Sequence, residues 1–150
     1  MLIDAYDFNT GSTIRSHILN NEKIEIHHIF PKAWCCEKHE IPQNKFRSSQ
    51  FNSIINKTPL LARTNRMIGG VAPSKYLDKI NTWSMQLPLF QEEPRADTPE
   101  DKLNSHLIPV EEFQDDDSEE FFEKRKEFLL KKIEKVMGKP VNRENEDSSD

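Results

Sequence analysis

The sequence predicts an α+β protein in which a short β-hairpin packs among several helices. Two observations predict the hairpin. Residues 23–27, Lys-Ile-Glu-Ile-His, alternate polar and apolar side chains as a half-buried strand does. A second ordered unit, residues 51–68, contains a strand opened by Asn56 and a short helix that bears Asn65. Gly69 and Gly70 are expected to end that helix.

The third observation is the strongest helical pattern in the chain, which runs from Ser118 to Met137. Asp117 and Glu120 suit its first turn as a capping pair, and Gly138 followed by Pro140 ends it. One apolar stripe, expected to pack on residues 1–85, contains Phe122, Leu129, Ile133 and Val136.

Composition excludes several classes of protein. The 150 residues are 35% hydrophobic and 31% charged, with mean hydropathy −0.79, and no apolar run approaches the ~18 residues that a membrane span requires. The N-terminus carries two aspartates and has no basic segment followed by an apolar run, so it does not resemble a secretory signal. The two cysteines are adjacent, which suits neither a disulfide framework nor a zinc ribbon. We therefore expect a cytoplasmic protein with no membrane partner.

The net charge of −5 conceals two segments of opposite sign. Residues 1–90 contain 11 Lys and Arg against 7 Asp and Glu, whereas residues 91–150 contain 10 against 19. The first segment is therefore mildly basic, which permits a polyanionic partner without requiring one.

Three short segments carry the residues suited to catalysis: HHIFP at 27–31, NKTPL at 56–60 and TNR at 64–66. A strand ending in two histidines, a strand opened by Asn56 and a helix bearing Asn65 would bring four polar groups together. Hydrolysis of a phosphodiester needs such a set, because a base must deprotonate water and a cation must stabilise the developing charge. Neighbouring strand residues point to opposite faces, so we expect both histidines to share one pocket only because the strand ends there.

These segments resemble the HNH (His-Asn-His, ββα-metal) nucleases, and most closely the HNH-bearing C-terminal part of GmrSD-type DNA restriction endonucleases. The resemblance covers roughly residues 5–140. It includes DFNTG at 7–11, SIINKTPL at 53–60, ARTNR at 62–66, APSKYL at 72–77, SHLI at 105–108 and the helix with Phe122, Arg125 and Leu129. It implies a ββα-metal core packed among helices, with a long C-terminal helix.

The resemblance also implies a role for each residue of the site. His28 would be the general base, and Asn56 would brace the loop that orients it. His27 and Asn65 would hold one divalent metal ion, Mg²⁺ or Mn²⁺, with Co²⁺ and Ni²⁺ also suited to an imidazole ligand. Many HNH nucleases have an aspartate where this chain has His27, so the preferred metal is expected to differ.

Several residues near the expected site have two interpretations. Lys57, Arg63 and Arg66 suit phosphate contacts, and they equally suit a solvated basic face. Asn65 could simply cap its helix, since asparagine favours helix ends. Glu25 could reach the metal or its surroundings, but an exposed strand residue is the simpler interpretation.

The sequence as a whole thus predicts a metal-dependent endonuclease that hydrolyses DNA phosphodiester bonds in a restriction or phage-defence system, leaving 5′-phosphate and 3′-hydroxyl ends. Its expected parts are a nuclease domain at 1–85, an acidic, proline-containing linker at 86–117, a packing helix at 118–138 and a disordered tail at 139–150. The resemblance suggests a nucleotide-dependent N-terminal domain or separate subunit as partner, and no GxxxxGK[ST] phosphate loop occurs here. The alternatives are a catalytically idle nucleic-acid-binding or assembly module, and an enzyme that cleaves RNA.

Overall fold

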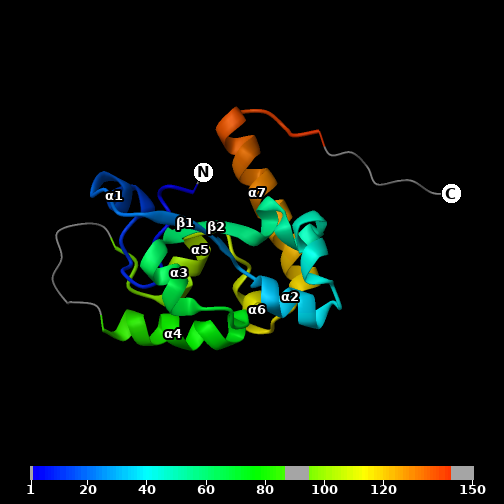
Figure 1. Cartoon of the computed structure of the whole chain (residues 1–150). Helices are drawn as coiled ribbons and strands as arrows, with labels where there is room; N and C mark the ends of the chain where they lie inside the picture. Colours follow the sequence, from blue (N-terminus) through cyan, green and yellow to red (C-terminus); the bar gives the residue numbers. More distant parts are fainter. Residues whose placement is uncertain (1, 87–94, 143–150) are drawn as a thin grey trace.

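The structure, a computed structural model, describes residues 2–86 and 95–142 and is α+β, as the sequence predicts (Figure 1). A two-stranded antiparallel sheet is surrounded by helices, and the longest helix lies at the C-terminal end of the described chain. In chain order the elements are α1 (Ile14–Leu19), β1 (Ile24–His28), α2 (Lys32–Lys38), the 3-10 turns η1 (Gln43–Ser48), η2 (Gln50–Asn52) and η3 (Ile54–Asn56), β2 (Lys57–Leu61), α3 (Ala62–Ile68), α4 (Pro73–Met85), α5 (Pro99–Ser105), α6 (Val110–Gln114) and α7 (Ser118–Met137).

The hairpin has the two strands that the sequence predicts, and α3 follows β2 directly. In its register His27 lies opposite Thr58, and His28 lies opposite Lys57. The pairing continues past β1, because the Ile29 N–H donates to the Asn56 carbonyl over 2.9 Å. β1 ends at His28, as expected, and the backbone pairing reaches only one residue further.

The connection between the strands, residues 29–56, is more ordered than its polar composition suggests. It forms α2 and three consecutive 3-10 turns. Ile29, Phe30, Cys35, Phe46 and Phe51 are buried along it and anchor it to the body of the protein. An apolar side chain every few residues thus holds a segment that would otherwise be a surface loop.

The core lies between the sheet and the helices of the second half of the chain. It is built from aromatic and aliphatic residues that come from the N-terminal loop through to the first turns of α7, including Phe8, Phe30, Leu60, Tyr76, Ile80, Leu103, Phe113 and Phe121. Aromatic rings meet edge to face within it, as in the pair Phe30–Phe121 with centroids 4.9 Å apart.

The sequence predicts a linker at 86–117, and this prediction is wrong for residues 95–117, the main part of that segment that the structure describes. Residues 99–114 contain α5 and α6, and Leu103, His106 and Phe113 on this segment are buried. Pro99 does not interrupt order, because it occupies the first turn of α5, where its missing N–H forfeits no helical hydrogen bond. The Thr98 side chain accepts a hydrogen bond from the Asp101 N–H and caps the same helix. Residues 87–94 of the expected linker lie outside the described residues.

Helix α7 has the predicted bounds, but its apolar stripe packs over only part of its length. Phe121 and Phe122 are buried and Leu129 is half-buried, whereas Ile133 is 45% exposed and Val136 is 80% exposed. The expected burial of the last two residues is therefore wrong. A 20-residue helix spans ~30 Å, and its C-terminal half extends beyond the body of the molecule (Figure 1).

The buried part of α7 also supplies one polar anchor. Arg125 has no exposed surface, and its guanidinium donates hydrogen bonds to the carbonyls of Ile54, Ile55, Lys57 and His106. These bonds hold the chain on both sides of Asn56. Burial lowers the pKa of Arg125 to about 10, which leaves the group charged at neutral pH.

Two further expectations concern the chain as a whole. Residues 143–150 of the expected tail lie outside the described residues, and residues 139–142 contain no helix or strand. Within the described chain, no helix combines the length and apolar character that crossing a membrane requires.

Candidate functional site

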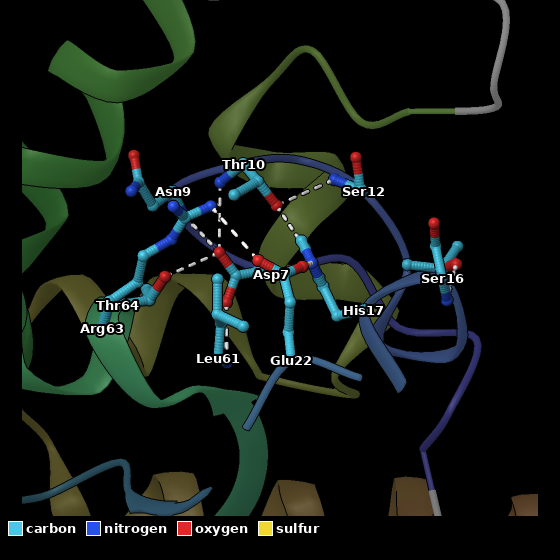
Figure 2. A network of polar contacts seen from close by, with 11 residues as sticks. Asp7, Asn9, Thr10, Ser12, Ser16, His17, Glu22, Leu61, Arg63 and Thr64 are labelled. Carbon is cyan, nitrogen blue, oxygen red and sulfur yellow. Dashed lines mark hydrogen bonds and ion pairs between the residues drawn. The ribbon is translucent and has the colours of Figure 1, made fainter. Parts of the chain in front are cut away.

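Asp7 fixes the start of α3, the helix that carries Asn65. Leu61, the residue before α3, has no side chain that can cap it. The buried Asp7 carboxylate does so instead: it accepts hydrogen bonds from the Leu61 N–H over 2.9 Å and from the Thr64 hydroxyl over 2.7 Å (Figure 2). A carboxylate at a helix N-terminus satisfies free N–H groups and complements the helix dipole.

The same carboxylate shapes the N-terminal loop. Asp7 Oδ2 also accepts the N–H groups of Asn9 and Thr10, each over 3.1 Å, in an Asx-type turn. The DFNTG segment, which carries part of the resemblance, is thus the element that ties the N-terminal loop to α3. Because Asn65 follows Thr64, this anchor also fixes the position of the Asn65 side chain.

His27 and Asn65 meet between β1 and α3. His27 Nδ1 lies 2.8 Å from Asn65 Oδ1, and the His27 side chain is 3% exposed. Its ring packs edge-on against Tyr76, with centroids 5.6 Å apart. Burial lowers the pKa of His27 to about 4, against a smaller opposing effect of the Asn65 hydrogen bond. The imidazole is therefore neutral at pH 7, and neutral imidazole is the form that binds metals.

Glu25 sets the orientation of the Asn65 amide. Asn65 Nδ2 donates to Glu25 Oε2 over 3.2 Å, and an ionised carboxylate only accepts, so the Asn65 oxygen must face His27. The hydrogen bond from Asn65, and after it the one from Lys23, lowers the pKa of Glu25. Glu25 is therefore a partly exposed strand residue whose carboxylate also contacts the candidate site. The period of two along β1 was the signal, because it places Glu25 and His27 on one face.

This geometry excludes the interpretation of Asn65 as a helix cap. The residue lies within α3, and its side chain bonds across to β1 instead of capping a helix end.

His28 points to the other face of β1. Its Nε2 lies 3.1 Å from Asn52 Oδ1, and its ring packs edge-on against Phe46, with centroids 5.5 Å apart. The structure therefore gives the two histidines separate partners, because both remain in the paired part of the hairpin. We had expected them to face one pocket, and this geometry corrects that expectation.

Asn56 is completely buried and links two segments of the inter-strand connection. Its Oδ1 accepts the Phe30 N–H over 2.8 Å, and its Nδ2 donates to the carbonyls of Phe30 and Phe51 over 3.0 Å and 2.7 Å. The side chain thus clamps the backbone two residues beyond His28. That is the kind of contact that a loop brace makes.

Two residues absent from the sequence-based set lie at the site. Asn52 contacts His28, as above. The Tyr76 hydroxyl donates a hydrogen bond to the Ile29 carbonyl over 2.6 Å, and the Tyr76 oxygen lies 3.5 Å from His27 Nε2. Neither could be found by local pattern, because each contact joins β1 to an element distant in sequence.

The three cationic candidates lie around the site in different settings. Lys57 is half-buried beside His28 across the hairpin. Arg63 is exposed on α3 and pairs with Glu22 at 3.8 Å (Figure 2). Arg66 is also exposed, and its charge contributes to the lowered pKa of Glu25.

The residues that could hold a metal ion are His27 and Asn65. Among residues 2–86 and 95–142, no three histidine, cysteine, aspartate or glutamate side chains gather as a metal-binding group. The 2.8 Å between His27 Nδ1 and Asn65 Oδ1 does suit two adjacent ligands of one octahedral ion. Bonds of about 2.0–2.1 Å place such ligands roughly 2.8–3.0 Å apart. The distance between the two atoms is thus compatible with two ligands of one divalent ion, and it is also the distance of the hydrogen bond between them.

Comparison with known proteins gives one informative similarity. No family model matches the chain, and no solved structure matches it. The chain is 32% identical over 126 residues to the "Uncharacterized protein MJ0686" of Methanocaldococcus jannaschii. The match includes 74% of this chain and 20% of that protein, so the chain spans about a fifth of the length of this curated relative.

Proposed function

We propose that this chain is the nuclease core of a metal-dependent DNA endonuclease of the HNH (ββα-metal) type, related to the C-terminal part of GmrSD-type restriction enzymes. The observation that carries the proposal is the contact between His27 and Asn65, a neutral imidazole and an amide oxygen 2.8 Å apart between a hairpin and the helix that follows it. His28, the next residue along the strand, is the candidate base.

One divalent ion, Mg²⁺ or Mn²⁺, with Co²⁺ and Ni²⁺ as further candidates, would be held by His27 Nδ1 and Asn65 Oδ1. Such an ion stabilises negative charge on the phosphate and on the leaving oxygen. Glu25 directs the Asn65 oxygen toward that position. The Tyr76 oxygen lies 3.5 Å from His27 Nε2 and would accept a hydrogen bond from the Nε2–H when Nδ1 serves as a ligand.

His28 supplies the general base from the opposite face of β1. In an in-line displacement the attacking water and the leaving oxygen lie on opposite sides of phosphorus. His28 lies on one face of β1, and the proposed cation site at His27 and Asn65 lies on the other. A phosphate bound across the end of β1 would therefore have the base on the side of the attacking water and the cation on the side of the leaving oxygen. Asn56 holds the chain beyond His28, and Asn56 itself is held by the Arg125 contacts on either side of it.

The partner that best suits this site is DNA. Lys57 lies beside His28 across the hairpin, and Arg63 and Arg66 lie on the exposed face of α3, where phosphate groups of a bound duplex could reach them. A restriction or phage-defence role in the cytoplasm, and a nucleotide-dependent N-terminal domain or separate subunit, complete the proposal. The small share of the relative that this chain covers leaves room for such a domain.

A second candidate function is a catalytically idle nucleic-acid-binding or assembly module. The burial of His27 favours it, because a side chain 3% exposed and bonded to Asn65 is also what a structural histidine looks like. The two functions make different predictions. The nuclease cleaves DNA in a reaction that needs the metal and His28, whereas the idle module binds DNA or a partner without cleaving DNA.

A plasmid-nicking assay with Mg²⁺ or Mn²⁺ tests the proposal. We expect the purified protein to nick the plasmid only with metal, and His28→Ala to lose about 10²–10⁴-fold of the rate while retaining its fold and Mn²⁺ binding. Asn65→Ala should lose Mn²⁺ binding, and Asn44→Ala, an exposed amide in η1, serves as the control.

An unchanged cleavage rate in His28→Ala would refute the role of His28 as the base. DNA binding by the unmodified protein without cleavage under every metal would contradict the nuclease function and favour the idle module.

A further inference from the structure

Asn52 joins His28 to the 3-10 turns between the two strands. Its Nδ2 donates to the Arg47 carbonyl over 3.0 Å, and its Oδ1 faces His28 Nε2 at 3.1 Å. A backbone carbonyl only accepts, so the amide nitrogen must lie toward Arg47 and the amide oxygen toward His28. An oxygen in that position requires a proton on His28 Nε2.

A neutral imidazole carries only one ring proton, so a proton on Nε2 leaves the lone pair on Nδ1. We propose that Asn52 is a positioning residue that selects this tautomer of His28 and holds its Nδ1 ready to accept a proton from water. The inference deepens the proposed nuclease function and rests on it for its catalytic part. The tautomer itself does not depend on that function.

The surroundings make Asn52 a rigid support. The Asn52 N–H donates to the Ser49 carbonyl over 3.1 Å, and the neighbouring Phe51 carbonyl accepts a bond from the buried Asn56 side chain. On the other side, the Phe46 ring packs against the His28 imidazole. Asn56 thus holds the backbone beside Asn52, and Asn52 holds the ring of His28, so two asparagines four residues apart have separate tasks.

Two substitutions distinguish a residue that positions the His28 ring from one that only links segments of the backbone. Asn52→Ala removes both the bond to Arg47 and the acceptor at His28. Asn52→Asp also loses the donor to Arg47 but keeps an acceptor oxygen that can face Nε2. A structural link would make the two variants equally poor, whereas positioning predicts that Asn52→Asp recovers much of what Asn52→Ala loses.

The first measurement is steady-state cleavage of a DNA substrate with saturating Mn²⁺. We expect Asn52→Ala to lower kcat about 10–100-fold, the usual effect of removing a partner that orients a functional group, with KM and the Mn²⁺ concentration for half-maximal activity unchanged. Asn52→Asp should restore kcat to within a few-fold of the unmodified protein, and Asn44→Ala should match the unmodified protein throughout.

The second measurement is independent of catalysis. In alkaline buffer, where the imidazole is neutral, ¹⁵N NMR of the histidine rings reports which nitrogen carries the proton, and His28→Ala identifies the His28 signals. We expect a protonated Nε2 and an unprotonated Nδ1 in the unmodified protein and in Asn52→Asp, and a mixture of tautomers in Asn52→Ala.

The outcomes divide as follows. A proton on Nδ1 in the unmodified protein, an unchanged kcat in Asn52→Ala, or equal losses in the two Asn52 variants overturns the inference. If the unmodified protein does not cleave DNA under any metal, the nuclease function fails, and the ring signals still decide whether Asn52 selects the His28 tautomer.

Discussion

His27 and Asn65 are separated by 38 residues in sequence and by 2.8 Å in the structure. The contact depends on the hairpin, which places His27 on the face toward α3, and on Asp7, which fixes the first turn of α3. The contact brings together the two proposed metal ligands, and the chemistry of these ligands determines the metal preference that we expect.

We expect half-maximal activation of cleavage at a lower concentration of Mn²⁺ or Co²⁺ than of Mg²⁺. The proposed ligands His27 and Asn65 are both neutral, and a strongly hydrated Mg²⁺ gains little by exchanging water for them. Affinity for imidazole rises from Mn²⁺ through Co²⁺ to Ni²⁺. Titration of each metal against plasmid nicking measures the order.

The matched variant is His27→Asp, which supplies the carboxylate common at this position in HNH nucleases, the family proposed for this chain. It should move the preference toward Mg²⁺ while cleavage persists. Equal or tighter activation of the unmodified protein by Mg²⁺ would show that a carboxylate contributes directly, and Glu25, already bonded to Asn65, would be the first to test.

Asp7→Ala should destabilise the protein and weaken the proposed metal site together. The substitution leaves the buried Leu61 N–H and Thr64 hydroxyl without their acceptor, and each unsatisfied buried group costs about 1–3 kcal/mol. We expect the free energy of unfolding from urea denaturation to fall by about 3 kcal/mol or more. Asp4→Ala, which removes an exposed carboxylate paired with Arg15, should leave the urea midpoint nearly unchanged. Similar midpoints for the two variants would refute the role of Asp7 as an anchor of α3.

The two halves of α7 should respond differently to substitution. Phe121 is completely buried, and Phe121→Ala should lower the free energy of unfolding by about 3–5 kcal/mol. Val136 is 80% exposed on the part of the helix beyond the body, so Val136→Asp should leave the Tm unchanged. Leu129→Asp should fall between them, because Leu129 is half-buried. Thermal unfolding followed by circular dichroism measures all three, and a large loss from Val136→Asp would show that this half of the helix is covered in solution.

His106 should make stability depend on pH in the acidic range. Burial lowers the pKa of His106 to about 3, while its bond to the Tyr6 carbonyl acts in the opposite direction. Below the ordinary histidine pKa of about 6.5 the unfolded chain binds a proton that the folded protein does not, so stability falls as pH falls. The contribution is roughly 1.4 kcal/mol per pH unit between about pH 6.5 and pH 3.

The matched variant for this prediction is His106→Gln, which has no titrating group. Urea denaturation of both proteins from pH 7 to pH 4 should show the stability difference between them shrinking, because only the unmodified protein loses this term. Parallel curves would mean that His106 binds its proton equally well in the folded and the unfolded protein.

The sequence by itself determined the elements whose signals are local. Alternation at residues 23–27 indicated β1, Gly69 indicated the end of α3, and Asp117 with Gly138 indicated both ends of α7, because strand period and helix caps act within a few residues. The segments HHIFP, NKTPL and TNR, with the resemblance they carry, indicated the candidate site residues. Only the tertiary structure decided which of those side chains meet.

Pairings across the chain were beyond any local pattern. Glu25 orients Asn65, Asn52 faces His28, and Arg125 binds the carbonyls around Asn56, in each case because two distant surfaces pack together. The same reason separates burial from apolar character: residues 99–114 are polar in composition and partly buried, while Ile133 and Val136 are apolar and exposed. A side chain is buried only where another element covers it, and the position of that element depends on the whole chain.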